Sequence, residues 1–124
     1  MSTNAVIAIS NSQFEMELTA IYVHWDGGQT LANDLDEYHD SWEHARDLVN
    51  MGDLSSVSGR DVESYFSRGE RWERVKPTEG DLKDLYNTYK SAEYYHIFHD
   101  SQWTFLYRDE VRQIVLEAAN EQDA

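Results

Sequence analysis

The apolar and polar positions near the start of the chain predict two β-strands joined by a turn. Ala5–Ser10 is a short apolar run, which is typical of a buried strand. In Glu15–Trp25 polar and apolar residues alternate, which indicates a second strand. From Ile21 onward the apolar residues occupy the other alternate set, so either both faces become buried there or a bulge shifts the register. We therefore expect a β-hairpin that ends at Gly27-Gly28.

The middle of the chain predicts helix followed by less regular structure. Thr30–Gly52 has apolar residues spaced three and four apart, as one face of a helix requires. Within it, Asp40-Ser41-Trp42-Glu43 has the form of a capping box, so a new helix can begin at Asp40. Asp53–Gly59 is rich in small polar residues and predicts a loop, whereas Val62–Val75 is ambiguous between strand and loop.

Beyond Pro77, the pattern predicts a helix, a second hairpin and a final helix. Thr78 or Asp81 can cap a helix that carries apolar residues from Leu82 to Tyr89. Glu93–Phe98 and Gln102–Arg108 read as aromatic-rich strands around a turn at His99-Asp100-Ser101. Asp109–Ala118 reads as a helix. We expect residues 1–124 to form a single domain with a frayed tail at 119–124.

The order of these elements predicts the fold class. Strands come in two hairpins, with helices between them and after them. This order is typical of an α+β domain, in which an antiparallel sheet built from two hairpins has its helices packed on one face.

The net charge of the chain limits the kinds of molecule that it can bind. The chain of 124 residues has 24 acidic and 10 basic residues, for a net charge of −14, and residues 1–59 contain a single base, Arg46. Such a protein repels DNA, RNA and anionic membranes, so we expect no direct nucleic-acid or membrane binding and favour a basic partner. The chain has no cysteine, which excludes disulfides, cysteine-ligated metals and a thiol nucleophile.

One candidate for chemistry is His24-Trp25-Asp26, at the end of the second predicted strand. His24 and Asp26 share a strand face and can form a metal pair or an acid–base pair. A zinc or iron site needs a third protein ligand, and none is evident, so a packed Trp25 beside a turn-forming Asp26 is the simpler interpretation. His39 and His44 are five apart, which is wrong for one helical face. We therefore predict no cofactor, no metal and no enzymatic activity.

An acidic stripe is the stronger lead. Asp36, Asp40, Glu43 and Asp47 are spaced four, three and four residues apart and would share one face of a continuous helix. Their axial spacing would be about 4.5–6 Å, comparable with the spacing of phosphates along a DNA strand. The stripe can therefore mimic DNA. A solvated helix face is the more common explanation of such a run of charges, and a helix start at Asp40 would break the alignment.

A mixed-charge segment, Arg68–Arg74, offers a second candidate surface. Arg71 and Trp72 are residue types enriched in protein-interface hot spots. Local ion pairing on a surface strand or turn is the alternative explanation of its alternating charges.

Several short motifs together resemble a known group of proteins. They are Tyr22–Gly27 (Y-V-H-W-D-G), Gly52–Val57 (G-D-L-S-S-V), Arg68–Glu70 (R-G-E) and Glu93–Phe98 (E-Y-Y-H-I-F). In this order they resemble an uncharacterised family of small bacteriophage and prophage proteins with a Y-x-H-W-D-G motif and a G-D-L-S-S loop. The chain departs from that pattern at Val23, where the family often has cysteine, and in the short loop Gly27–Gln29. The resemblance implies a phage accessory protein acting in a bacterial cytoplasm, with no catalytic residue to carry over.

Charge and resemblance together suggest a function. We expect an acidic phage-type protein that binds and inhibits a basic nucleic-acid-binding host protein, of the anti-restriction or anti-CRISPR type, with DNA mimicry as one mode. The alternative is a structural or regulatory interaction domain with no inhibitory role, and a small metal-dependent enzyme centred on His24 and Asp26 ranks third. A homodimer is compatible with any of these.

Overall fold

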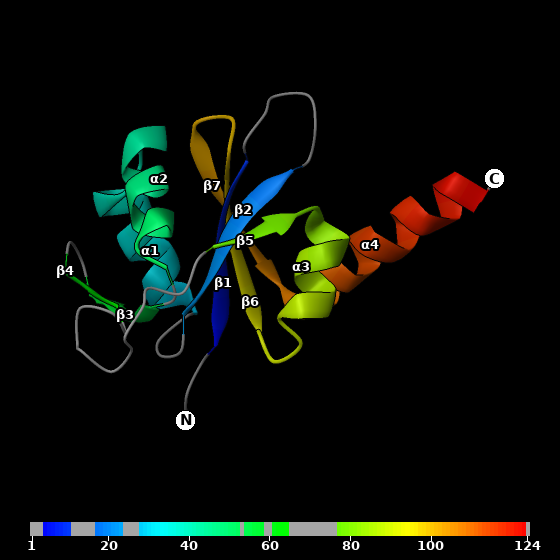
Figure 1. The fold of residues 1–124 in the computed structure, drawn as a ribbon, viewed down its shortest axis with the longest axis horizontal. Coiled ribbons are helices and arrows are strands. Elements are labelled where there is room, and N and C mark those ends of the chain that lie inside the picture. The colour runs from blue at the N-terminus through cyan, green and yellow to red at the C-terminus, as the bar shows by residue number, and fades with distance from the viewer. Residues whose placement is uncertain are drawn as a thin grey trace.

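The computed structural model describes residues 4–10, 17–23, 28–52, 54–58, 61–64 and 77–123. In chain order the elements are β1 (Ala5–Ser10), β2 (Leu18–Val23), α1 (Gln29–Tyr38), α2 (Trp42–Asn50), β3 (Leu54–Ser58), β4 (Asp61–Ser64), β5 (Thr78–Gly80), α3 (Leu82–Thr88), β6 (Tyr94–His99), β7 (Gln102–Tyr107) and α4 (Arg108–Asp123). The described strands form one sheet in the order β4-β3-β2-β1-β6-β7, and β5 also pairs with β2. The α+β class expected from the sequence is therefore confirmed (Figure 1).

The first hairpin forms as predicted and lies at the centre of the sheet. β1 pairs antiparallel with β2 in an unbroken register from Ala5 opposite Val23 to Ser10 opposite Leu18. All six residues of β1 are buried. Because the register has no bulge, the shift of apolar positions at Ile21 reflects burial on both faces of β2, where Leu18, Ile21 and Val23 are all inaccessible to solvent.

The sheet is mixed, which corrects the prediction of a purely antiparallel one. The second hairpin, β6–β7, is antiparallel as expected, but β6 joins the free edge of β1 in a parallel arrangement, with Ala5 opposite Tyr94. β3 also runs parallel to β2, where Val23 lies opposite Leu54. Helices supply the long connections that parallel neighbours require, and the sequence places helices between the two hairpins.

Helices cover both faces of the sheet, which corrects the prediction that they pack on one. Ala5, Ile7 and Ile9 of β1 belong to a core cluster with α1 and α2. Val6 and Ala8 belong to a second cluster with α3 and the start of α4. Figure 1 shows these two helix pairs on opposite sides of β1 and β2. A central strand that is apolar on both sides needs cover on both sides, which explains this three-layer arrangement.

Two further segments differ from expectation. Residues 54–58, predicted as loop, form strand β3, because Leu54 and Val57 are buried against the α1–α2 cluster. α4 continues to Asp123, through the residues that were assigned to a tail. Of the helices in the described ranges, none combines the length and the apolar composition needed to cross a membrane.

Local capping signals set the ends of the remaining elements. Asp81 caps α3 in a reciprocal capping box with Asp84, so Asp81 and not Thr78 is the cap. The β6–β7 turn consists of Asp100 and Ser101, whose φ angles are 55° and 64°. Two consecutive residues with positive φ are characteristic of the two-residue hairpin turn whose twist matches that of the strands.

Candidate functional site

The predicted helix over residues 30–52 is interrupted at the acidic stripe. α1 ends at Tyr38, and α2 begins at Trp42. The cap of α2 is Ser41, whose side-chain oxygen accepts a hydrogen bond from the main-chain N–H of His44 at 3.1 Å. A new helix does begin near Asp40, as the capping pattern indicated, but one residue later and with a serine as its cap.

This interruption separates the four carboxylates of the predicted stripe. Asp36 lies on α1, Asp40 lies in the connection, and Glu43 and Asp47 lie on α2. All four residues are exposed. Since they do not share one helix, the regular axial spacing that suggested a match to DNA phosphates does not apply.

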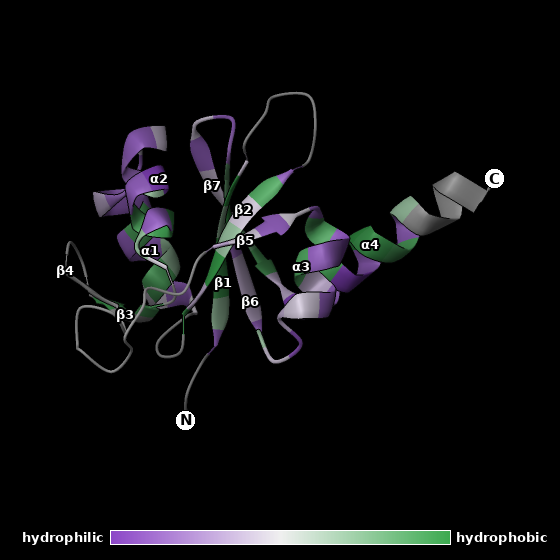
Figure 2. Ribbon diagram, in the orientation of Figure 1, coloured by the Kyte–Doolittle hydropathy of each residue, from purple (hydrophilic) through white to green (hydrophobic). Residues whose placement is uncertain are grey.

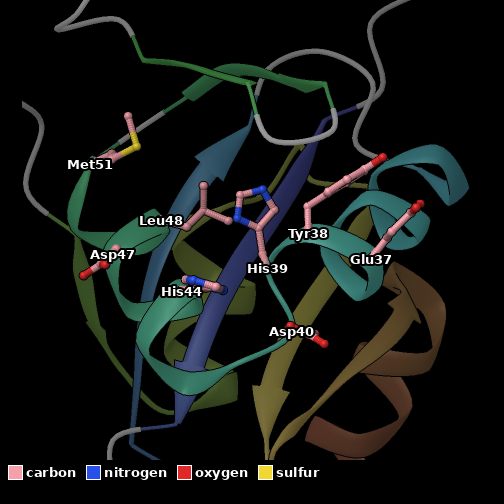
Figure 3. A pocket seen from close by; sticks show the side chains of 8 residues that line it. All are labelled: Glu37, Tyr38, His39, Asp40, His44, Asp47, Leu48 and Met51. Carbon is pink, nitrogen blue, oxygen red and sulfur yellow. The ribbon is translucent and has the colours of Figure 1, made fainter.

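The break instead creates a pocket between the two helices. It has a volume of 640 Å³. Its lining residues are Glu37, Tyr38, His39, Asp40, His44, Asp47, Leu48 and Met51. Figure 3 shows the side chains of His39 and Leu48 near its middle, with Asp40 and Asp47 pointing away from each other on opposite sides. Two of the four predicted acids therefore line the pocket, and Asp36 and Glu43 do not.

Six of the eight lining residues were not among the predicted site residues: Glu37, Tyr38, His39, His44, Leu48 and Met51. The spacing of five between the two histidines argued against a shared face, and that argument holds only for a single helix. Because His39 caps the end of α1 and His44 lies in the first turn of α2, the bend brings both to one pocket. The sequence signal for this was Ser41, a strong helix-capping residue directly after Asp40.

The pocket is strongly acidic. Residues 28–52 contain six acids and one base, which gives this region a net charge of −5. The base, Arg46, contacts Asp47 at 3.3 Å and lies 5.0 Å from the centre of the Trp42 ring. Both side chains of the Arg46–Asp47 pair are exposed, so the pair adds little stability, and the region keeps its negative potential. Figure 2 shows hydrophilic residues along the outer sides of α1 and α2.

The floor of the pocket is apolar and packs on the core. Leu48 is 2 % exposed and belongs to the core cluster, and Met51 packs against that cluster. The wall at His39 is tied to the sheet, because the indole N–H of Trp103 in β7 donates to the His39 carbonyl at 2.8 Å. Trp103 itself contacts Phe98 edge-on, with ring centres 5.2 Å apart. The pocket is therefore held by the packed core.

This arrangement suits binding of a cationic side chain. Lysine and arginine combine an aliphatic stem with a charged head, so the stem can lie on Leu48 and Met51 while the head reaches a carboxylate. Within the ranges that the structure describes, no three histidine, aspartate or glutamate side chains are grouped so that they could hold a metal ion.

The other predicted site residues lie outside the described residues. These are His24, Trp25 and Asp26 of the strand-end motif, and Arg71 and Trp72 of the mixed-charge segment. Their proposed roles stay predictions.

No protein-family model, curated protein or solved structure matches this chain. The resemblance to small phage proteins therefore stays an expectation based on the motifs alone.

Proposed function

We propose that this protein binds a basic segment of another protein through the acidic pocket between α1 and α2. The observation that supports this most directly is the composition of the pocket. Glu37, Asp40 and Asp47 line a 640 Å³ cavity together with the apolar Leu48 and Met51, on a protein of net charge −14. A lysine or arginine side chain satisfies both parts of such a site.

The charge outside the pocket favours the same class of partner. A field of this sign attracts a basic surface over distances up to the Debye length of about 8 Å and raises the rate of encounter. Complementary charge also selects against acidic partners.

We further propose that the partner is a basic nucleic-acid-binding host protein and that binding inhibits it. The support for this step is the net charge together with the motif resemblance to phage accessory proteins. Because the acidic stripe is split between two helices, we favour competition for a basic surface over mimicry of evenly spaced phosphates.

The test of the binding step compares the whole chain with a pocket variant as baits in bacterial lysate. The variant is Glu37→Gln/Asp40→Asn/Asp47→Asn, which removes three charges with little change in side-chain shape. We expect wild type to retain a basic nucleic-acid-binding protein that moderate salt releases, and we expect the pocket variant to lose it, because an exposed charge contact is weakened by salt.

A matched control removes three charges elsewhere. Glu79, Glu93 and Glu117 are exposed acids on β5, before β6 and on α4. Their triple change to glutamine should leave capture intact, which separates the pocket from net charge. If wild type, the pocket variant and the control variant retain the partner equally, the pocket is not the binding site. A neutral partner that survives high salt would instead favour an interaction domain with no inhibitory role.

The inhibitory step needs its own assay. The captured protein is purified, and its binding to nucleic acid is measured with and without an excess of wild type, pocket variant or control variant. Inhibition by wild type and control alone is expected. Binding of the partner without loss of its nucleic-acid affinity would contradict inhibition and leave the binding proposal intact.

A further inference from the structure

Strand β7 presents an open edge of the sheet. It is the last strand in the sheet order, and among the described residues its strand neighbour is β6 alone. All six of its residues, Gln102–Tyr107, pair with β6 in a regular register. The segment reads Q-W-T-F-L-Y, with no charge and no proline. Charges, prolines and bulges are the usual devices that keep an edge strand from pairing further, and β7 has none of them.

The hairpin geometry determines which main-chain groups of β7 point outward. In a hairpin closed by a two-residue turn, the closing pair, here His99 and Gln102, exchanges hydrogen bonds, and the pairs then alternate. Trp103, Phe105 and Tyr107 therefore direct their N–H and C=O groups away from β6. The N–H of Tyr107 bonds the Glu110 carboxylate at 3.1 Å, as an outward direction requires. This leaves Trp103 and Phe105 as the positions where an added strand can pair.

An aromatic surface lies beside this edge. Side chains of alternate residues share a face, so those of Trp103, Phe105 and Tyr107 line the same side of β7. Phe105 stacks on Tyr94 with ring centres 5.4 Å apart and contacts Tyr107 edge-on at 5.3 Å. Tyr107 is 52 % exposed. Such rings can receive arginine side chains of an added strand through cation–π contacts.

Two kinds of strand could pair with this edge: β7 of a second copy of the chain, or a basic segment of another protein. Net charge favours the basic segment. A second copy of the chain has the same net charge of −14, and the repulsion between the two proteins opposes pairing of β7 with itself. A basic segment is attracted, and the acidic pocket adjoins the edge, since the Trp103 indole bonds the His39 carbonyl in the pocket wall.

We propose that β7 pairs with an extended basic segment of the partner protein, which adds a strand to the sheet at Trp103 and Phe105. Main-chain hydrogen bonds hold the segment at the edge, alternate arginine or lysine side chains lie over the aromatic surface, and a further cationic side chain enters the pocket. This inference rests on the proposed function, because the pocket and the net charge supply the choice of a basic occupant.

The test is amide hydrogen exchange measured by NMR on the whole chain, with and without a synthetic peptide. The probe is a peptide of about ten residues that alternates arginine and valine, a pattern suited to an added strand. At saturating peptide we expect exchange at the Trp103 and Phe105 amides to slow by about tenfold or more. Thr104 and Leu106 serve as internal references, because their amides already face β6 and should change little.

Two comparisons separate this inference from the proposed function. A glutamate–valine peptide should give no protection, and protection by both peptides would overturn the basic occupant. If the pocket variant binds the arginine–valine peptide with unchanged affinity and shows the same protection at Trp103 and Phe105, the pocket has no role in binding. The edge pairing would remain supported. Peptide binding to wild type without slower exchange at Trp103 and Phe105, or no binding, would overturn the edge pairing.

Discussion

The guanidinium of Arg108 lies 4.2 Å from the centre of the Tyr86 ring and so joins the start of α4 to α3. The same guanidinium donates to the carbonyl oxygens of Tyr89 and Ala92, at 3.2 and 3.5 Å, and to the Tyr95 hydroxyl at 3.1 Å. Tyr89 is the C-cap of α3, whose final carbonyls have no partner within the helix. Arg108 therefore satisfies the end of one helix from the first residue of another.

We expect Arg108→Ala to lower the free energy of unfolding by about 2–3 kcal/mol, because it leaves half-buried acceptors without their charged donor. Urea denaturation with the midpoint and slope fitted separately measures this loss. Arg112→Ala, an exposed position on α4, is the control and should change stability by less than about 0.5 kcal/mol. Equal effects of the two substitutions would contradict the linking role of Arg108.

Tyr95 should make stability depend on alkaline pH. Burial raises the pKa of its hydroxyl above the ordinary value of 10.0, and this outweighs the nearby charge and hydrogen bond of Arg108, which act in the opposite direction. Because the unfolded chain then loses this proton at a lower pH than the folded one, the stabilisation is complete below the ordinary pKa. It is lost as pH rises through the folded pKa.

The corresponding measurement is urea denaturation of wild type and Tyr95→Phe between about pH 8 and about pH 11. Wild type should lose stability more steeply than the variant across the upper part of this range. Because the two proteins differ only in this hydroxyl, the difference between their curves isolates Tyr95. Parallel curves would show that this hydroxyl does not contribute.

Substitutions at Asp40 and Ser41 test which of these two adjacent residues caps α2. Since the Ser41 side chain holds the His44 amide, Ser41→Ala should cost about 1 kcal/mol, and Ser41→Asp should keep most of the stability. Asp40→Ala should cost much less, because Asp40 lies before the cap. If Asp40→Ala lowers stability more than Ser41→Ala in thermal or urea unfolding, the cap of α2 is Asp40, as the sequence pattern indicated.

The hydrogen bond that anchors the pocket wall can be removed while an aromatic ring is kept at the same position. Trp103→Phe keeps a ring against Phe98 but loses the N–H that bonds the His39 carbonyl, so we expect a loss of about 1 kcal/mol. Capture of the basic partner should weaken as well, because the wall at His39 is no longer fixed. Trp42→Phe is the control: Trp42 is 46 % exposed, and its change should leave stability nearly unaltered. If the Trp103→Phe variant captures the partner as well as wild type does, the bond between Trp103 and His39 is not needed for binding at the pocket.

Local sequence patterns were sufficient where the controlling interaction is short in range. The apolar run of β1 and the turn between β6 and β7 depend on neighbours within a few residues, and the same kind of pattern reduced the cap of α3 to Thr78 or Asp81. Predictions were wrong where the controlling interaction joins residues far apart in the sequence. Residues 54–58 look like a loop because their polar residues dominate locally, and burial of Leu54 and Val57 by distant helices makes them a strand. A single-sequence pattern cannot contain that information.

The sequence by itself determined the α+β class, the two hairpins and the acidic charge of residues 28–52, because composition and short-range periodicity carry these properties. Only the tertiary structure decided that β6 lies parallel to β1, that helices cover both faces, and that His39, His44 and three carboxylates share a pocket. Periodicity shows which side of an element is buried. Which distant segment buries it depends on packing among residues that can lie some ninety positions apart, as Ala5 and Tyr94 do.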